Sequence, residues 1–302
     1  MHTKLERCLS AINEVVLGKE TQVRLAVACL LARGHLLIED LPGMGKTTLS
    51  HTLARVLGLD YQRIQFTADL LPGDILGTSV FDPRSGQFTF HPGPIFAELV
   101  LADEINRATP KCQSALLEAM EEGQVTHEGV THALPSPFFV IATQNPSSQS
   151  GTYALPESQL DRFLMCLSLG YPALTAERDL LLGSARRGLL ADLQPLLASG
   201  ELAEAQRAVD AVHASGAVVD YVLRLVTATR QNEPGGTGLS PRASLALLAA
   251  ARAWAWLAGR DYLIPEDVQA VLPAVAGHRL GAHESGAGAA QLYWLLDEVP
   301  VL

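Results

Sequence analysis

The sequence has few cysteines and little charge, and each shortage excludes a class of protein. Its four cysteines, Cys8, Cys29, Cys112 and Cys166, lie far apart and form no C-x-x-C pair. This spacing argues against a disulfide scaffold or a zinc module and suits reduced thiols. Charged residues make up only 18% of the chain, against 48% apolar residues. That balance is typical of a folded globular protein and excludes a disordered one.

The sequence also lacks a long apolar run and an excess of basic residues. The longest uncharged stretch, from Gly129 to Pro156, is rich in Pro, Ser, Gln, Asn and Thr, and the first residues contain no apolar segment of signal-peptide length. Lys and Arg number 22 against 32 Asp and Glu, a formal net charge of −10. Because non-specific nucleic-acid binding needs a dense basic surface, the charge disfavours a nucleic-acid partner. We expect a cytoplasmic protein without a membrane span.

The order of apolar patterns predicts two domains, of about 150 residues each. Short apolar runs alternate with helical patterns in the first part of the chain, which predicts a parallel α/β sheet covered on both faces. The predicted strands are 34–40, 61–66, 98–104, 137–145 and 163–171, and the helices that follow are 175–190, 201–213, 218–231, 241–257 and 265–271. We therefore expect an α/β core at 1–172 and an all-helical domain at 173–302.

Two segments, near 78–92 and 124–136, interrupt this alternation. The first has aromatic residues at alternate positions around a P-R-S-G turn, and the second turns at a Glu-Gly pair. Both patterns are typical of a β-hairpin inserted into the core. His127 and His132 lie on the second hairpin without a Cys or carboxylate at metal-ligand spacing. We expect them to be exposed hairpin residues and not metal ligands.

A glycine-containing loop joins the first predicted strand to a helix. It consists of Asp40, Leu41, Pro42, Gly43, Met44, Gly45, Lys46, Thr47 and Thr48. Backbone N–H groups in such a loop, with a helix N-terminus behind them, bind phosphate; Lys46 would contact the phosphates and Thr47 would bind Mg²⁺. The loop departs from the pattern G-x-x-x-x-G-K-[ST] at Asp40, so we expect that carboxylate to point away from phosphate. The alternative, a plain strand-to-helix connection, is disfavoured by the motif and its position.

Two carboxylates end the apolar run at 98–104. Side chains alternate along a strand, so Asp103 and Glu104 should leave in different directions and serve different purposes. Asp103 suits an outer contact to Mg²⁺ near Thr47, and Glu104 suits the polarisation of an attacking water. The alternative, a strand that meets solvent at a polar turn, loses weight because a phosphate loop lies upstream.

Taken together, these segments resemble the AAA+ ATPases, and within them the MoxR family. The resemblance rests on LIEDLPGMGKTTL, FTADLLPGDILGT, FHPGPIFAELVLADEINRATPKCQSALLEAMEEGQVT, PFFVIATQNP, YALPESQLDRF and LSPRASLAL, in family order from about residue 34 to 248. It implies a P-loop core with a five-stranded parallel sheet ordered 5-1-4-3-2, a smaller all-helical lid, ATP with Mg²⁺, and a hexameric ring. It also implies chaperone-like work on a client protein, a partner with a von Willebrand factor A domain, and hairpins that face the pore or the client.

The family motifs match further residues one by one. Asn145 falls at the sensor-1 position, where its amide would orient the water beside Glu104. Arg162 matches the arginine finger, which would act on the nucleotide of the neighbouring subunit. Arg242 matches sensor 2. It is also a cation in the first turn of a helix capped by Ser240, where the helix dipole disfavours it, so we expect an anionic partner such as a bound phosphate.

Less specific matches complete the set. Val16 and Gly18 lie in a segment that resembles the one near adenine, and Arg107 resembles a residue with an intersubunit role. Simpler interpretations of the matched residues stay open: a strand-ending turn for Asn145 and a surface partner of Asp161 for Arg162.

The sequence thus predicts a MoxR-type AAA+ ATPase that hydrolyses ATP in a ring and remodels or matures a protein client. The alternatives are a nucleic-acid motor, a metal-chelatase motor subunit and a slow nucleotide-dependent switch. One arginine in the two hairpin turns argues against the motor, and the intact pair Asp103 and Glu104 argues against the switch.

Overall fold

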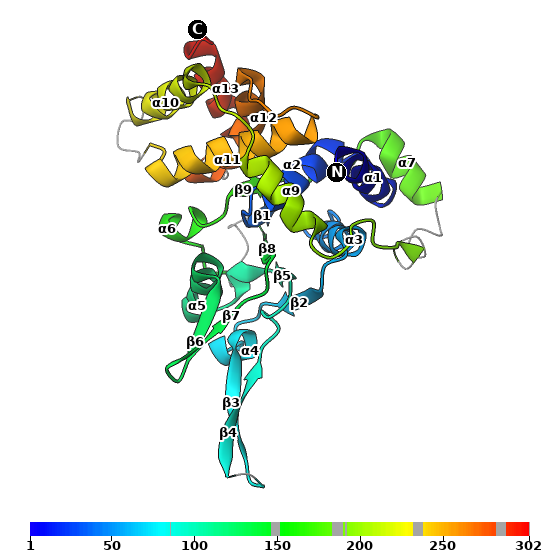
Figure 1. Cartoon of the computed structure of the whole chain (residues 1–302), viewed down its shortest axis with the longest axis vertical. Helices are drawn as coiled ribbons and strands as arrows, with labels where there is room; N and C mark the ends of the chain where they lie inside the picture. Colours follow the sequence, from blue (N-terminus) through cyan, green and yellow to red (C-terminus); the bar gives the residue numbers. More distant parts are fainter. Residues whose placement is uncertain are drawn as a thin grey trace.

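The computed structural model describes residues 1–84, 86–145, 152–182, 190, 192–231, 238–281 and 288–301 (Figure 1). At its centre lies a five-stranded parallel sheet in the order β2-β5-β8-β1-β9. The strands are Leu36–Glu39 (β1), Tyr61–Gln65 (β2), Leu99–Asp103 (β5), Phe139–Gln144 (β8) and Met165–Leu167 (β9). Numbered among themselves along the chain and read from β9, they stand in the order 5-1-4-3-2, which confirms the predicted topology.

Alternate residues of the sheet face two apolar cores. Leu36 and Ile38 pack with α1 to α3 and with the helices from α9 onward, whereas Leu37 packs with α4 and α5. Burial on both faces is the reason that these strands are apolar throughout. The helices are α1 (His2–Val15), α2 (Glu20–Leu31), α3 (Lys46–Leu57), α4 (Pro72–Leu76), α5 (Pro110–Glu122), α6 (Glu157–Leu160), α7 (Leu174–Leu182), α9 (Glu201–Asp210), α10 (Gly216–Gln231), α11 (Pro241–Leu257), α12 (Pro265–Ala276) and α13 (Gly288–Glu298), with 3₁₀ turns η1 (Ile105–Arg107) and η2 (Gly277–Arg279).

Every element described after β9 is helical, as predicted. Local signals placed some ends well: α11 begins after Ser240, whose side chain accepts the N–H of Ala243 at 3.1 Å. Residues 183–189 of the predicted helix 175–190 lie outside the described residues, as do Ser85 of the first hairpin turn and Pro146 of the motif PFFVIATQNP. The helices α1, α2, α4, α6 and α13 were not among the predicted ones. None of the described helices is long and apolar enough to cross a membrane.

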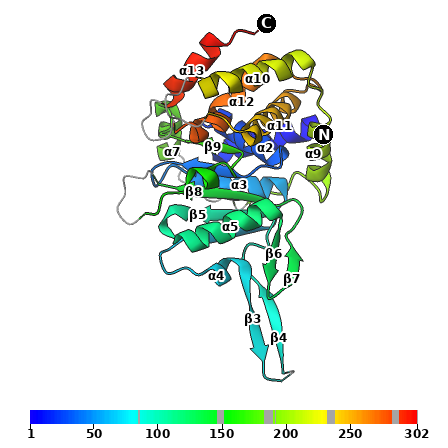
Figure 2. The ribbon, with the colours of Figure 1, turned by 90° about the vertical axis from the view of Figure 1, so that its left-hand side faces the viewer.

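Two antiparallel hairpins leave the sheet (Figures 1 and 2). The first, β3 (Gly77–Asp82) with β4 (Gln87–Pro92), extends far from the body, and the second, β6 (Gln124–His127) with β7 (Val130–Ala133), lies beside its base. The ring of His132 stacks on Phe90 with 4.1 Å between centroids, and that of His127 lies 5.4 Å from it. The prediction that both histidines are exposed was wrong, because an aromatic residue of the other hairpin covers them.

Candidate active site

The loop between β1 and α3 forms a cradle lined by backbone. Gly43 and Gly45 have φ of 86° and 92°, the left-handed region that favours glycine. A side chain built on either would project into open space. Because α3 begins at Lys46, the free N–H groups of its first turn face this loop. A concave loop of N–H groups in front of a helix N-terminus is the arrangement that binds phosphate.

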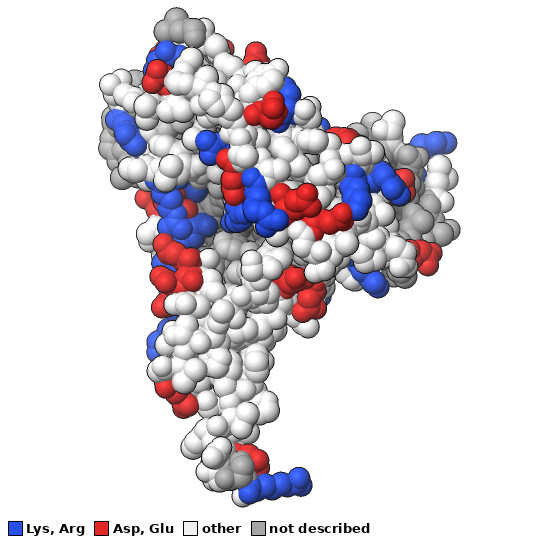
Figure 3. All heavy atoms as spheres, in the orientation of Figure 1, with Lys and Arg blue, Asp and Glu red and all other residues white. Residues whose placement is uncertain are grey.

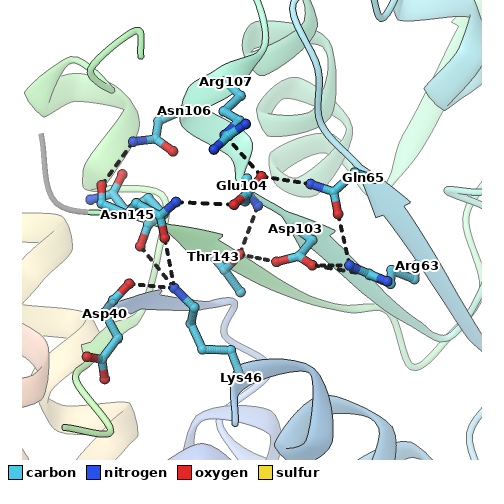
Figure 4. Close-up of polar contacts among 11 residues, drawn as sticks. Asp40, Lys46, Arg63, Gln65, Asp103, Glu104, Asn106, Arg107, Thr143 and Asn145 are labelled. Atoms are coloured by element: carbon cyan, nitrogen blue, oxygen red, sulfur yellow. Dashed lines mark hydrogen bonds and ion pairs between the residues drawn. The ribbon is translucent and has the colours of Figure 1, made fainter. Parts of the chain in front are cut away.

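The Lys46 ammonium lies at the edge of this cradle (Figure 4). It donates to the backbone oxygen of Asp40 at 2.6 Å and to Oδ1 of Asn145 at 3.3 Å, and the residue is only 8% exposed. Within the described part of the chain it forms no ion pair. Burial lowers the pKa of the ammonium, and the carboxylates of Asp40, Asp103, Glu104 and Glu39 act in the opposite direction. A buried cation without an ion-pair partner is unfavourable until an anion completes it, so this site fits the phosphates of a nucleotide.

The Asp40 carboxylate points away from the cradle, as predicted. It accepts the N–H of Gly170 at 2.7 Å, the N–H of Leu41 at 2.9 Å and the hydroxyl of Ser168 at 3.3 Å. The unusual first residue of the loop therefore does not set a negative charge against phosphate. Of the remaining loop residues, Leu41, Pro42, Thr47 and Thr48 are exposed and Met44 is half-buried.

Asp103 ends β5 and is fixed by its neighbours in the sheet. Arg63 of β2 binds Oδ2 at 2.6 Å, and the hydroxyl of Thr143 on β8 donates to Oδ1 at 2.6 Å (Figure 4). The sequence analysis missed both partners. A signal existed for Thr143, because it is a polar residue within the buried apolar run of β8. Arg63 lies on an exposed strand face and offered no such signal.

Glu104 lies directly beyond β5 with φ 57° and ψ 49°. The expectation that the Glu104 side chain diverges from that of Asp103 stays a prediction. Both carboxylates contact β2: Asp103 binds Arg63, Glu104 binds Gln65, and Arg63 donates to Gln65 at 2.9 Å. The Glu104 carboxylate accepts from Asn145 Nδ2 at 3.2 Å and Gln65 Nε2 at 3.0 Å, and pairs with Arg107 at 3.0 Å. A non-glycine residue in this left-handed conformation costs about 1 kcal/mol, and the contacts of the carboxylate with Asn145, Gln65 and Arg107 offset that cost.

Asn145 thus lies beside Glu104, where the sequence placed it. Its own carbonyl accepts from Asn106 Nδ2 at 3.0 Å, a contact that the sequence analysis did not foresee. Arg107, expected to serve a neighbouring subunit, pairs within this chain with Glu104 and is half exposed. Val16 and Gly18 lie in the turn between α1 and α2, where Gly18 has φ 64°.

Arg162 and Arg242 lie together at the amino ends of the parallel strands, here called the amino edge of the sheet. The cradle lies at the carboxyl ends of the strands, the carboxyl edge. Arg162 precedes β9, and Leu164 there donates to the carbonyl of His35 at the start of β1. At roughly 3.3 Å per residue of strand, that start is about 15 Å from the phosphate loop. Both guanidinium groups bind one carboxylate, Glu121, with Arg162 at 3.1 Å and Arg242 at 3.2 Å. Within the chain the anionic partner of Arg242 is the carboxylate of Glu121, and the bound phosphate stays a prediction.

A buried arginine holds this pair in place. Arg279 in η2 binds Asp161 Oδ1 at 2.6 Å and the carbonyl of Phe163 at 2.8 Å, on both sides of Arg162. The hydroxyl of Ser240, the residue that caps the helix of Arg242, donates to the other oxygen of Asp161 at 3.3 Å. A cavity of about 320 Å³ opens beside them, with Arg33, His35, Glu121, Arg162, Arg242 and Arg279 in its lining.

The donor set near the cradle suits Mg²⁺. The Thr47 hydroxyl and the Asp103 carboxylate are oxygen ligands, and no group of three or more His, Cys, Asp or Glu side chains that could hold a metal ion occurs among the described residues. Mg²⁺ keeps several waters and is commonly bound through one or two protein oxygens together with substrate phosphates. These residues therefore fit a Mg²⁺ ion that binds with a nucleotide.

Comparison with known proteins agrees with this geometry. Residues 35–165 match the model of the ATPase family associated with various cellular activities (AAA), and residues 227–292 match the AAA lid domain. The chain is 47% identical to YeaC of Bacillus subtilis, over 94% of this chain and 88% of YeaC. It is 44% identical to Chaperone MoxR1 of Mycobacterium tuberculosis, over 93% of this chain and 76% of MoxR1. A crystal structure of a protein from Cytophaga hutchinsonii, 35% identical, superposes with a TM-score of 0.89 over 100% of this chain and 96% of that one. The chain belongs to the MoxR family of AAA+ ATPases.

Proposed function

We propose that this protein binds ATP in the cradle at 40–48 and hydrolyses its terminal phosphate bond. The observation that carries the proposal is that one amide joins the lysine to the glutamate. Asn145 Oδ1 lies 3.3 Å from the Lys46 ammonium, and Asn145 Nδ2 lies 3.2 Å from the Glu104 carboxylate (Figure 4). Lys46 would bind phosphate oxygens, while Glu104 accepts a proton from a water that Asn145 orients.

Thr47 and Asp103 would hold Mg²⁺, the first directly and the second through water. The bound ion supplies charge neutralisation on the phosphates. Arg63 and Thr143 hold the Asp103 carboxylate at its place in the sheet. The turn that contains Val16 and Gly18 would lie beside the adenine.

Arg162 and Arg242 would serve the nucleotide of a neighbouring copy in a ring, a hexamer by resemblance to the family. They lie at the amino edge of the sheet, whereas the chain's own cradle lies at the carboxyl edge, about 15 Å away along β1. Their shared contact with Glu121 supports the assignment, because one carboxylate binds two guanidinium groups as a phosphate would. In this proposal the core, 1–172, contributes Arg162 and the lid, 173–302, contributes Arg242.

The work of hydrolysis would be done on a client protein, with a von Willebrand factor A domain protein as partner. The name of the relative Chaperone MoxR1 supports the client; the partner rests on the family resemblance. The first hairpin supports a protein contact as well, because Phe81 and Phe88 are 50% and 68% exposed and the projecting part shows few charged side chains (Figure 3). A neutral, apolar hairpin suits a protein surface better than nucleic-acid phosphates.

Two variants test the assignment of Lys46 and Glu104. Lys46→Ala should lose ATP affinity, measured by calorimetry, because it removes the cation on the phosphates. Glu104→Gln should keep that affinity while phosphate release falls by roughly 10²–10⁴, the usual worth of a general base. Lys4→Ala, which removes an exposed lysine paired with Glu201, is the matched control and should change neither. Unchanged ATP affinity in Lys46→Ala would exclude the cradle as the phosphate site.

A further inference from the structure

Lys19 is a buried cation in an unfavourable position. It is the N-cap residue of α2 and is 7% exposed, and its ammonium donates to the carbonyls of Gly170 at 3.0 Å and Tyr171 at 2.8 Å. The positive end of a helix dipole and burial both disfavour a cation there. A residue that breaks two local rules points to a role for the contact that it makes.

Asp40 holds the same residue, Gly170, through its other backbone group. The N–H of Gly170 donates to Asp40 at 2.7 Å, while the carbonyl of Gly170 accepts from Lys19 at 3.0 Å. Two buried charges of opposite sign are thus joined through one residue, whose φ of 61° is one that glycine adopts readily. The segment leads directly into α7, so its backbone is fixed between the start of the phosphate loop and the start of α2.

The order of the strands indicates which part of a nucleotide this segment would meet. Glu104 and Asn145, which face the terminal phosphate in the proposed function, follow β5 and β8 on one side of β1, and β9 lies on the other side. A nucleotide whose terminal phosphate faces that pair extends its nucleoside end toward the carboxyl end of β9, over residues 168–171. The turn that contains Gly18 packs closely on α7, the helix that follows this segment: a Cβ on Gly18 would lie 3.0 Å from the Cβ of Ala176.

We propose that Asp40 and Lys19 are positioning residues for the nucleoside end of the bound nucleotide. They hold residues 168–171 as a wall for the base and ribose, beside the turn that contains Gly18. The inference rests on the proposed function, because it requires a nucleotide in the cradle. It also accounts for the departure from the loop pattern: glycine at position 40 would still permit a phosphate loop, but the N–H of Gly170 would lose its carboxylate.

The test compares a ligand that has a nucleoside with one that has phosphates alone. Dissociation constants for adenylyl imidodiphosphate, which has a nucleoside, and for inorganic tripolyphosphate, which has none, are measured by calorimetry with Mg²⁺. Asp40→Gly, which restores the loop pattern, should bind the nucleotide about tenfold more weakly, as expected for lost hydrogen bonds to a charged group, and keep its affinity for tripolyphosphate. Lys19→Met should show the same selective loss, because it removes the donor to the carbonyls of Gly170 and Tyr171.

Two further variants sharpen the result. Asp40→Asn keeps the shape and one acceptor and should restore part of the nucleotide affinity. Asp74→Asn is the matched control, because it replaces a carboxylate that accepts the N–H of Leu71 at 2.8 Å at the start of α4. The melting temperature of this variant should fall, while the ratio of its two ligand affinities stays that of the wild type.

Every outcome of these measurements supports or overturns the positioning role of Asp40 and Lys19. Equal weakening of both ligands, or no weakening of either, in folded Asp40→Gly and Lys19→Met would overturn the positioning role and leave ATP binding standing. If Asp40→Gly does not fold, Asp40→Asn and Lys19→Met decide by the same ratio. A wild-type protein that binds neither ligand would overturn the proposed function and this inference with it.

Discussion

The two edges of the central sheet build their polar groups in different ways. At the carboxyl edge, Lys46 begins the helix after β1, Asp103 ends β5 and Glu104 follows it. Backbone conformation places these residues, through left-handed glycines in the loop and a left-handed Glu104. At the amino edge, Arg162 and Arg242 come from remote parts of the chain and are held together by Glu121 and, through Asp161, by Arg279. In the proposed function the carboxyl edge binds the phosphates with groups of a single chain. The amino edge presents cations to whatever lies beyond it, which is why we infer that a full site needs two chains.

The largest effect expected concerns Arg162. Arg162→Ala should bind ATP almost normally and hydrolyse it at least 10³-fold more slowly, because arginine fingers are worth roughly 10³–10⁵ in rate. Mixing inactive Arg162→Ala with inactive Lys46→Ala should restore part of the phosphate release, since some interfaces then combine an intact carboxyl edge with an intact amino edge. The restored rate should rise with protein concentration, because the site exists only on assembly.

Pairs that damage the same edge are the controls for this experiment. Lys46→Ala with Glu104→Gln should not recover, because no subunit then has both Lys46 and Glu104 intact at its carboxyl edge. Arg162→Ala with Arg242→Ala should not recover either, because both arginines come from one subunit's face. If the first mixture stays inactive while mixed rings form, the arginines act within their own chain and the comparison of the two edges fails.

A smaller effect is expected where the amino edge is anchored. Arg279→Met leaves Asp161 without its buried partner and should lower the free energy of unfolding by about 2–4 kcal/mol. It should also slow ATP hydrolysis by the folded protein while ATP affinity stays, because Arg162 loses its support. The matched control is Arg260→Met, which breaks the ion pair of Arg260 with Asp267 away from this edge. It should cost stability alone; equal loss of hydrolysis in both variants would make Arg279 a general stabiliser.

The smallest expected effect is a pH dependence of the free energy of unfolding that comes from His35, at the amino edge. Burial lowers the pKa of His35 from 6.5 to about 4, and its ring accepts the N–H of Val140 at 3.0 Å through Nδ1. The unfolded chain takes up a proton that the folded one resists, so the free energy of unfolding falls as the pH drops from 6.5 toward 4. Between pH 7 and 5 this contribution is about 1–2 kcal/mol. Denaturant titrations should show a flatter pH dependence for His35→Gln, and an unchanged one for the exposed control His91→Gln. An unchanged slope in His35→Gln would mean that other groups set the acid sensitivity.

Local patterns predicted much of the fold and of the carboxyl edge. The strands follow from apolar runs that are buried on both faces, and the ends of α5 follow from Thr109 with Pro110 and from Gly123, whose φ is 62°. The direction of the Asp40 carboxylate followed from charge alone. The positions of α1 and α2 were missed, although the burial of Leu5, Cys8 and Ile12 shows a helical period in α1.

What the sequence by itself determined is therefore whatever depends on near neighbours in the chain: strands, caps, and a phosphate loop whose glycines, lysine and helix start are consecutive. What only the tertiary structure decided is which distant groups meet. Arg63 and Thr143 meet Asp103 because β2 and β8 flank β5. Glu121 lies between Arg162 and Arg242, and Gly170 lies between Asp40 and Lys19. The physical reason is that a hydrogen bond or ion pair between remote residues leaves no period in the sequence. Its geometry exists only after the sheet has ordered its strands and the helices have packed against it.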